Sequence, residues 1–392
     1  MTQVLYRRYW SPEKCSAGIK PADRFVDVRL KLQVVLLSLS SSNLRLGPVC
    51  NSAYDVLALP SSEKTLISNI KSAATARARQ GHSYRYASSP KSGRVVTGIG
   101  DDCAVLRVAP EHDLLTTTDF SLENVHFRRV WHPPESVGHR CLARGLSDIA
   151  AMGGDPVAAF LSLGLPAKLP QTWVDRFTRG LLKLASEFDV TLAGGDTAQS
   201  PTGILADIVV LGSVPKGKAV LRSGARPGDQ IYVTGSLGAS AAALELLFSK
   251  RQLVPKQFPR HFFPQPRVSQ GRFLRAKNFA SAMIDVSDGL STDLNHICEE
   301  SGVGAEILED AIPRAVIGRN GEPVSLKCAL HGGDDYELLF TARRRRRVPL
   351  EISGVPVTCI GEITRGTRVS ILSTSGKRSR LNAGGWRHFR DQ

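Results

Sequence analysis

The chain has 392 residues, of which 42% are hydrophobic and 22% are charged, and its formal net charge is +15. These values are typical of a soluble globular protein with two or three domains. The seven cysteines are odd in number, widely spaced and without a Cys-x-x-Cys pair. This argues against a disulfide framework and a zinc site, and it favours a cytoplasmic protein.

Two further classes are disfavoured. The apolar stretch at 28–40 is too short and too interrupted by charge to span a bilayer, so we expect no membrane partner. The basic excess permits nucleic-acid binding, but no motif of a known nucleic-acid-binding module is present, so we expect no nucleic-acid partner. A basic nucleic-acid-binding or scaffold protein is the weakest alternative.

The composition and the hydrophobic periodicity of the sequence change within its first hundred residues. Residues 1–59 differ in composition from the rest and show no sustained period, so we interpret them as a poorly ordered extension. A helix start signal follows at 61–63, and apolar residues then recur at helical spacing. Two short strands are expected on either side of the GIGDD turn within 95–108, and a third strand at 113–119.

Two helices are predicted next, at 134–152 and at 171–188. The first ends at Gly153 and Gly154, a plausible C-terminal cap. Strands are expected at VTLAGGD and at 204–211. The Pro-Gly turn in GARPGD is the most natural boundary, and it predicts an N-terminal domain at 60–219 and a C-terminal α/β domain at 220–392.

The second half mixes strands and helices irregularly. Strands are expected at QIYVTG, at the run ending in IDVSDG, after Gly302 and within 355–373, and helices at 240–248 and from Ser291. The prediction is therefore a mixed α/β (α+β) fold with two domains, an N-terminal sheet domain and a C-terminal α/β domain.

Aspartate recurs at the ends of apolar runs or inside an apolar helix, in GIGDDC, TTTDF, LSDIA, AGGDT, DVSDGLSTD and HGGDDYE. Any one of these would most often be a turn or a helix cap. Asp148 is different, because a carboxylate among Leu, Ile and Ala is costly unless it is paired or metal-bound. Six such placements favour a shared acidic site, and carboxylates beside Thr and Ser hydroxyls favour magnesium carrying phosphates.

Other features leave alternatives open. GSVPKGKA at 212–219 nearly matches a P-loop, but Ala219 lacks the hydroxyl that would hold magnesium. His126 is either a capped loop residue or a substrate contact. Arg222 is either a solvated side chain or a phosphate contact.

Taken in order, GIGDDCAVL, TTTDFSLENVHF, ARGLSDIAAMGGDP, AGGDT, LRSGARPGD, IDVSDGLSTDL and GGDDYELLF resemble the motifs of the thiamine-monophosphate kinases, over roughly 60–390. The resemblance implies the two-domain architecture of aminoimidazole ribonucleotide synthetase, with ATP and magnesium bound by the N-terminal domain at 60–219. It further implies a homodimer built through the N-terminal sheets. It also implies transfer of the γ-phosphoryl group of ATP, the co-substrate, to thiamine monophosphate with Mg²⁺ as cofactor. No general base is expected, because the phosphate acceptor is already an anion at neutral pH.

The resemblance also assigns residues. Magnesium ligands are implied at Asp102, Thr117, Thr118, Asp119, Asp148, Asp196, Asp285 and Asp288. ATP contacts are implied at Asp102, Gly195, Asp196, Arg222 and Ser287, and substrate contacts at His126, Asp334 and Trp386. Asp334 stands where the family usually has Glu, and Asn124 where it usually has Gly.

Within the same superfamily, a selenophosphate synthetase or a HypE-like protein is the alternative. The first needs a reactive Cys in a glycine-rich context near its start, and neither Cys15 nor Cys50 is so placed. The second needs a reactive C-terminal cysteine, whereas this chain ends in HFRDQ.

Overall fold

The computed structural model describes residues 63–76, 94–99, 103–317 and 321–386. All of them fall in one unit of the chain, Val56–Gln392. The predicted extension at 1–59 and the predicted metal ligand Asp102 lie outside the described residues. Within the described ranges, none of the helices combines the length and the apolar composition needed to cross a membrane.

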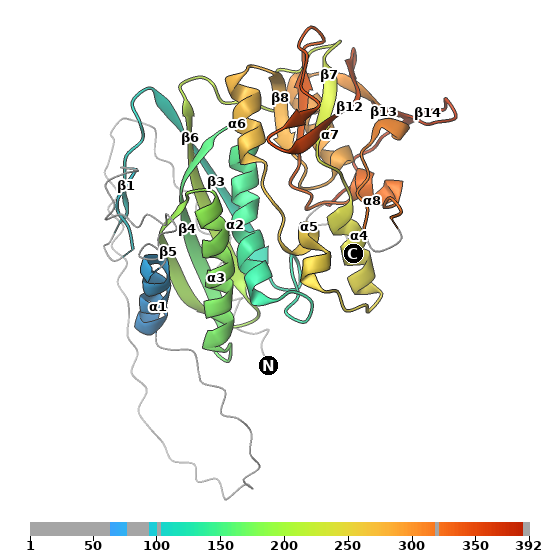
Figure 1. Cartoon of the computed structure of the whole chain (residues 1–392). Coiled ribbons are helices and arrows are strands. Elements are labelled where there is room, and N and C mark those ends of the chain that lie inside the picture. Colours follow the sequence, from blue (N-terminus) through green and yellow to red (C-terminus); the bar gives the residue numbers. More distant parts are fainter. Residues whose placement is uncertain (1–62, 77–93, 100–102, 318–320, 387–392) are drawn as a thin grey trace, which may run out of the picture. The chain divides into compact units, whose positions relative to one another are not determined.

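The N-terminal half is built on a four-stranded sheet in the order β3-β6-β4-β5. The two outer pairs differ, since β3 is antiparallel to β6 whereas β4 and β5 are parallel. Two long helices, α2 and α3, cover one face of this sheet (Figure 1). The elements are α1 (Glu63–Ala76), β1 (Val95–Thr97), β2 (Val105–Leu106), β3 (His112–Leu122), α2 (Pro134–Ala151), β4 (Asp155–Pro166), α3 (Gln171–Glu187), β5 (Thr191–Ser200) and β6 (Leu205–Pro215).

The C-terminal half is built on an eight-stranded sheet in the order β14-β13-β9-β12-β7-β10-β8, with β11 added beside β12. Its strands are β7 (Gln230–Thr234), β8 (Ala280–Asp285), β9 (Gly304–Leu308), β10 (Leu338–Ala342), β11 (Glu351–Ile352), β12 (Val355–Thr364), β13 (Val369–Leu372) and β14 (Arg378–Arg380). Its helices are α4 (Ala239–Phe248), η2 (Pro255–Gln257), α5 (Pro259–Phe262), α6 (Val268–Ala276), α7 (Leu290–Ser301), η3 (Glu309–Ala311) and α8 (Leu326–His331).

Helix α2 begins and ends as its sequence predicts. Pro134 occupies the first turn, where a missing N–H is tolerated, and Gly153 follows the helix with a left-handed φ of 67°. Between these signals the apolar side chains of α2 pack against β3 and β6. The functional side chains of this helix are therefore held on a rigid element.

Helix α2 touches its neighbours at the level of the backbone. A Cβ atom on Gly138 would lie 2.0 Å from the Phe177 carbonyl oxygen of α3, and one on Gly180 would lie 2.0 Å from the Glu135 carbonyl oxygen. On the other side, a Cβ on Gly271 of α6 would lie 2.0 Å from the carbonyl oxygen of Ala150. Only glycine permits such close approach, so α2 is fixed between α3 and α6.

The predicted elements agree with the structure in most places, but several elements were missed. The largest is β4 in the middle of the sheet, whose first half is a continuous apolar run, so that only its second half alternates between buried and half-buried residues. Strand β10 was missed because all five of its residues are buried, which leaves no alternation along the strand. The short helices α5, α6 and α8 were also missed, and β3 is longer than the predicted 113–119.

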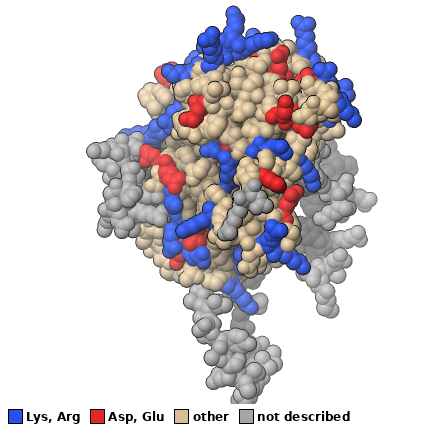
Figure 2. Space-filling view, turned by 45° about the vertical axis from the view of Figure 1, so that its right-hand side comes forward, with Lys and Arg blue, Asp and Glu red and all other residues tan. Residues whose placement is uncertain are grey.

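The basic excess is visible on the surface. Figure 2 shows Lys and Arg side chains gathered at the upper end of the view and spread among fewer acidic side chains below. In the run 343–347, Arg343 donates to the buried Asp229 at 2.9 and 3.0 Å, while the other four arginines are exposed. Such a surface favours the approach of polyanionic substrates.

Candidate active site

Four oxygen-bearing side chains from three elements meet where the two halves of the described unit face each other. Alternation along β3 directs Thr117 and Asp119 to the face covered by α2, where Asp148 lies. The Thr117 hydroxyl donates a short hydrogen bond to the Asp148 carboxylate, and Asp119 is hydrogen-bonded to the same carboxylate. Asp285, at the end of β8, accepts a 2.6 Å hydrogen bond from the Ser147 hydroxyl.

The electrostatics of this acidic cluster (Thr117, Asp119, Asp148 and Asp285) favour a bound cation. Burial, reinforced by the charge of Asp148, raises the pKa of Asp119 to about 7 and the pKa of Asp285 to about 8. Burial also raises the pKa of Asp148, although the hydrogen bond from Thr117 opposes the shift. Three crowded carboxylates and a hydroxyl are oxygen donors of the kind that Mg²⁺ prefers, so the residues present fit a magnesium ion.

The cluster lies at one end of a cavity of about 1140 Å³. The opposite end is aromatic, where the rings of Trp131 and Phe248 meet edge to face at 5.0 Å and the Arg128 guanidinium lies 4.3 Å from the centre of the Trp131 ring. A cavity of this size holds drug-sized ligands. Its two ends suit ligands with phosphates at one side and aromatic rings at the other.

Asp334 lies in the wall of the cavity between these ends. Its carboxylate accepts hydrogen bonds from Arg140 at 2.7 Å and from the Tyr336 hydroxyl at 2.7 Å, and it pairs with Arg144 at 3.4 Å. Burial alone would raise the pKa of Asp334, but the two guanidinium groups outweigh it and hold this pKa well below its ordinary value. Asp334 and Tyr336 both have left-handed backbones, with φ of 61° and 51°. Such strain in non-glycine residues is typical of functional sites.

Models of the AIR synthase related proteins match two parts of the chain, the N-terminal domain at 100–214 and the C-terminal domain at 226–372. The thiamine-monophosphate kinase of Salmonella typhimurium is 41% identical over 293 residues, which cover 71% of this chain and 88% of the relative. The Escherichia coli K12 enzyme is 39% identical over 318 residues, covering 78% and 96%. The chain belongs to the thiamine-monophosphate kinase family.

Solved structures of this kinase family have the same fold. The thiamine-monophosphate kinase of Stenotrophomonas maltophilia matches with a TM-score of 0.67 at 34% identity, covering 81% of this chain and 98% of the other. AaThiL complexed with AMPPCP and TMP matches with a TM-score of 0.63 at 33% identity, covering 72% and 89%. The hydrogenase maturation protein HypE shares the fold alone, at 18% identity.

The residues that the kinase resemblance assigned to magnesium do not all lie on the same face of the N-terminal sheet. Thr118 and Asp196 lie on the face of the N-terminal sheet that points away from α2, although Thr118 also lines the cavity. On this face the Thr118 hydroxyl donates a 2.7 Å hydrogen bond to Asp207. Ser162 of β4 pairs with Asp196 on one side and with Asp207 on the other, so the two aspartates lie on the same face. Gly195 is where β5 closely approaches β4, since a Cβ on it would lie 1.8 Å from the Leu161 carbonyl oxygen.

The other predicted contacts of a kinase site line the cavity. They are His126, Arg222, Ser287, Asp288, Asp334 and Trp386. The sequence left open whether His126 is a capped loop residue or a substrate contact. Its Nδ1 accepts a 3.0 Å hydrogen bond from the Leu122 amide, as in a capped loop, and its side chain also lines the cavity. The roles of these residues stay predictions.

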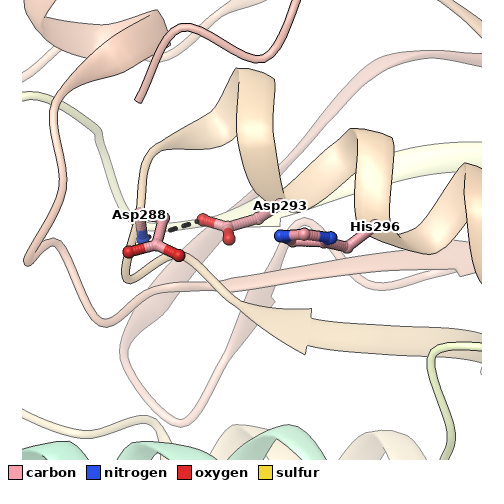
Figure 3. Close-up of side chains that lie close together, drawn as sticks. All are labelled: Asp288, Asp293 and His296. Atoms are coloured by element: carbon pink, nitrogen blue, oxygen red, sulfur yellow. Dashed lines mark hydrogen bonds between the residues drawn. The ribbon is translucent and has the colours of Figure 1, made fainter. Parts of the chain in front are cut away.

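Asp288 is also part of a second group, with Asp293 and His296, whose ligand atoms all lie within 4.8 Å of one another (Figure 3). The Asp293 carboxylate accepts hydrogen bonds from the backbone amides of Asp288 at 3.2 Å and Gly289 at 3.0 Å. It therefore holds the turn that leads into α7. We assign Asp293 this local role, which fixes where Asp288 enters the cavity.

Sequence reasoning missed Arg140 and Arg144, which line the cavity of this kinase family member. Both precede Asp148 on α2, at intervals of four residues. The signal was present, because three charged side chains at this spacing lie on one face of a helix whose remaining surface is buried.

Proposed function

We propose that this protein transfers the γ-phosphoryl group of ATP to thiamine monophosphate in this cavity, giving thiamine diphosphate and ADP. The observation that carries the proposal is the acidic cluster, in which one buried and two half-buried carboxylates have raised pKa values at the end of a cavity that has aromatic rings at its other end. Relatives at 39–41% identity named thiamine-monophosphate kinase, and a homologue complexed with AMPPCP and TMP, support the same reaction.

The chemistry asks for positioning and charge neutralisation. A phosphate oxygen of the acceptor attacks the γ-phosphorus of ATP in line, the bond from that phosphorus to the β–γ bridging oxygen breaks, and ADP leaves with that electron pair. The acceptor oxygen is already ionised, so no side chain has to remove a proton. Thr117, Asp119, Asp148 and Asp285 would hold Mg²⁺, which neutralises phosphate charge when bound. The chain itself contributes alignment of two anionic substrates on rigid elements.

The remaining assignments belong to the same proposal. Asp102, Thr118, Asp196 and Asp288 are proposed as further metal ligands, and Gly195, Asp196, Arg222 and Ser287 as ATP contacts. His126 and Trp386 are proposed for the thiamine side; the indole of Trp386 is half exposed at the cavity rim. A cytoplasmic location fits the described cysteines, which are all free thiols.

The deciding experiment is incubation of the full chain with Mg²⁺, ATP and thiamine monophosphate, with chromatographic detection of thiamine diphosphate. We expect product and ADP in equal amounts, and loss of both when EDTA is present. A folded protein that forms no thiamine diphosphate, or that hydrolyses ATP at the same rate without the acceptor, would overturn the proposal.

We also propose a homodimer built through the N-terminal sheet. The face of β3 that points away from α2 exposes large apolar side chains, with Leu114 49% and Phe120 54% exposed. Light scattering should give about twice the chain mass of 42.4 kDa. Leu114→Asp should shift the protein towards the single-chain mass, because a charge on this strand opposes burial. A single-chain mass for the parent protein would contradict the proposal.

A further inference from the structure

Three charged side chains follow one face of α2 towards the aromatic end of the cavity. Asp148 belongs to the acidic cluster, Arg144 lies one turn before it, and Arg140 one turn before Arg144. Four residues of a helix rise about 6 Å, close to the length of one phosphate group with its oxygens. Arg144 therefore lies about one phosphate group away from the proposed metal site, on the side of the aromatic rings.

The two arginines are fixed by their contacts. Arg144 donates to the Phe120 carbonyl oxygen at 2.7 Å, and its side chain is only 14% exposed. Arg140 donates to the His261 carbonyl oxygen at 2.5 Å, and its side chain is 5% exposed. Both guanidinium groups contact the carboxylate of Asp334, and Arg144 also interacts at longer range with the carboxylates of Asp119 and Asp148.

At contact distance, two guanidinium groups face one carboxylate in the cavity wall. Because Asp119 and Asp148 would be engaged by a bound Mg²⁺, Asp334 alone does not neutralise these two largely buried guanidinium groups. A charge withdrawn from water is costly unless an opposite charge meets it. Both oxygens of Asp334 are already engaged, one by Arg140 and the other by Arg144 and the Tyr336 hydroxyl. Asp334 is thus arranged to hold these partners, and the free binding capacity in this wall is for an anion.

We propose that Arg144 binds the phosphate group of the acceptor, thiamine monophosphate, and that Asp334 is a positioning residue that holds Arg144 for this task. The proposal rests on the proposed function and deepens it. It orients the acceptor, with its phosphate between Asp148 and Arg144 and its rings towards Trp131 and Phe248. A guanidinium group is suited to this role because its planar N–H fork matches two phosphate oxygens.

The first test uses Arg144→Gln in the full chain, with the affinities for thiamine monophosphate and for thiamine measured by calorimetry. Loss of a charge-assisted phosphate contact should weaken binding of thiamine monophosphate about 10- to 100-fold. Binding of thiamine, which has no phosphate, should change less than about twofold. Arg144→Lys, which keeps the charge and loses the fork, should fall between the parent and Arg144→Gln. The matched control is Arg176→Gln, which removes an exposed side chain of α3 that pairs with Glu135 of α2. This variant should bind thiamine monophosphate and thiamine as the parent does.

The second test concerns Asp334. Asp334→Asn should raise the KM for thiamine monophosphate about tenfold, with the KM for ATP nearly unchanged, because Arg144 loses its anchor while the nucleotide contacts remain. Asp334→Glu restores the carboxylate and should lie closer to the parent protein. Circular dichroism of each variant shows whether the fold is kept.

The outcomes separate the two proposals. If the parent enzyme makes no thiamine diphosphate, the proposed function fails. If the parent is active but Arg144→Gln weakens thiamine and thiamine monophosphate equally, or weakens neither, only the phosphate role of Arg144 is overturned. If Asp334→Asn raises both KM values alike, or Asp334→Glu is no better than Asp334→Asn, the positioning role of Asp334 is overturned.

Discussion

Asp148→Asn should lower kcat by at least about 100-fold while leaving the magnesium-free protein no less stable than the parent. The activity falls because one of three clustered carboxylates is lost from the proposed metal site, and removal of one group that stabilises transition-state charge typically costs 10²- to 10³-fold. The stability is kept because Asn relieves repulsion with Asp119 and can still accept the hydrogen bond from Thr117.

The measurements are kcat with saturating thiamine monophosphate and thermal unfolding in EDTA. Asp175→Asn, at an exposed carboxylate on α3, is the matched control and should change neither quantity. Opposite directions for activity and stability are the signature of a functional acidic site. If Asp148→Asn unfolded at a clearly lower temperature and its activity fell only in proportion, Asp148 would be a structural residue.

When the pH falls from 7 to 5, the free energy of unfolding of His139→Gln should rise by about 2 kcal/mol relative to that of the parent. Burial lowers the pKa of His139 from 6.5 to about 4, although its hydrogen bond to the Pro264 carbonyl opposes the shift. Because the folded pKa lies below the unfolded one, the unfolded chain binds more protons between these values, and this histidine destabilises the fold as the pH falls. Glutamine does not titrate and can still donate to the Pro264 carbonyl oxygen.

The check is urea denaturation of the parent and of His139→Gln at both pH values. The variant has to be compared with the parent at each pH, because buried carboxyl groups act in the opposite direction to His139. Burial raises the pKa of Asp285 and Asp335 to about 8, so the folded protein gains stability from both groups as the pH falls. The free energy of unfolding of the variant, relative to the parent, should rise by about 2 kcal/mol on acidification. A relative stability that stays constant with pH would show that His139 does not titrate on unfolding.

The sequence predicted the parts of the site that local chemistry determines. Asp148 stood out because a carboxylate in an apolar helix needs a partner, and the structure places it beside Asp119 with its pKa raised by burial. The boundaries of α2 were predicted from Pro134 at its first turn and Gly153 after its last turn, because each of these residues marks a helix end by itself.

What escaped prediction depends on three-dimensional pairing. Thr117 and Thr118 are neighbours in the sequence, yet alternation along β3 sends them to opposite faces, and only Thr117 meets Asp148. Likewise, Arg140 and Asp334 are 194 residues apart, so nothing in either local sequence announces their ion pair. Strand β10 was missed because a strand that is buried along its whole length has no alternation to detect.

The glycines behind α2 extend the active site beyond the residues that line the cavity. Asp148 and Arg144 are carried by a helix whose backbone touches α3 at Gly138 and Gly180 and whose last turn touches α6 at Gly271. Even one added methyl group at these contacts would displace the whole helix, and a misplacement of about 1 Å can reduce a reaction rate about 100-fold. Substitutions that lower the reaction rate are therefore expected at these glycines on the back of the helix, although none of them lines the cavity.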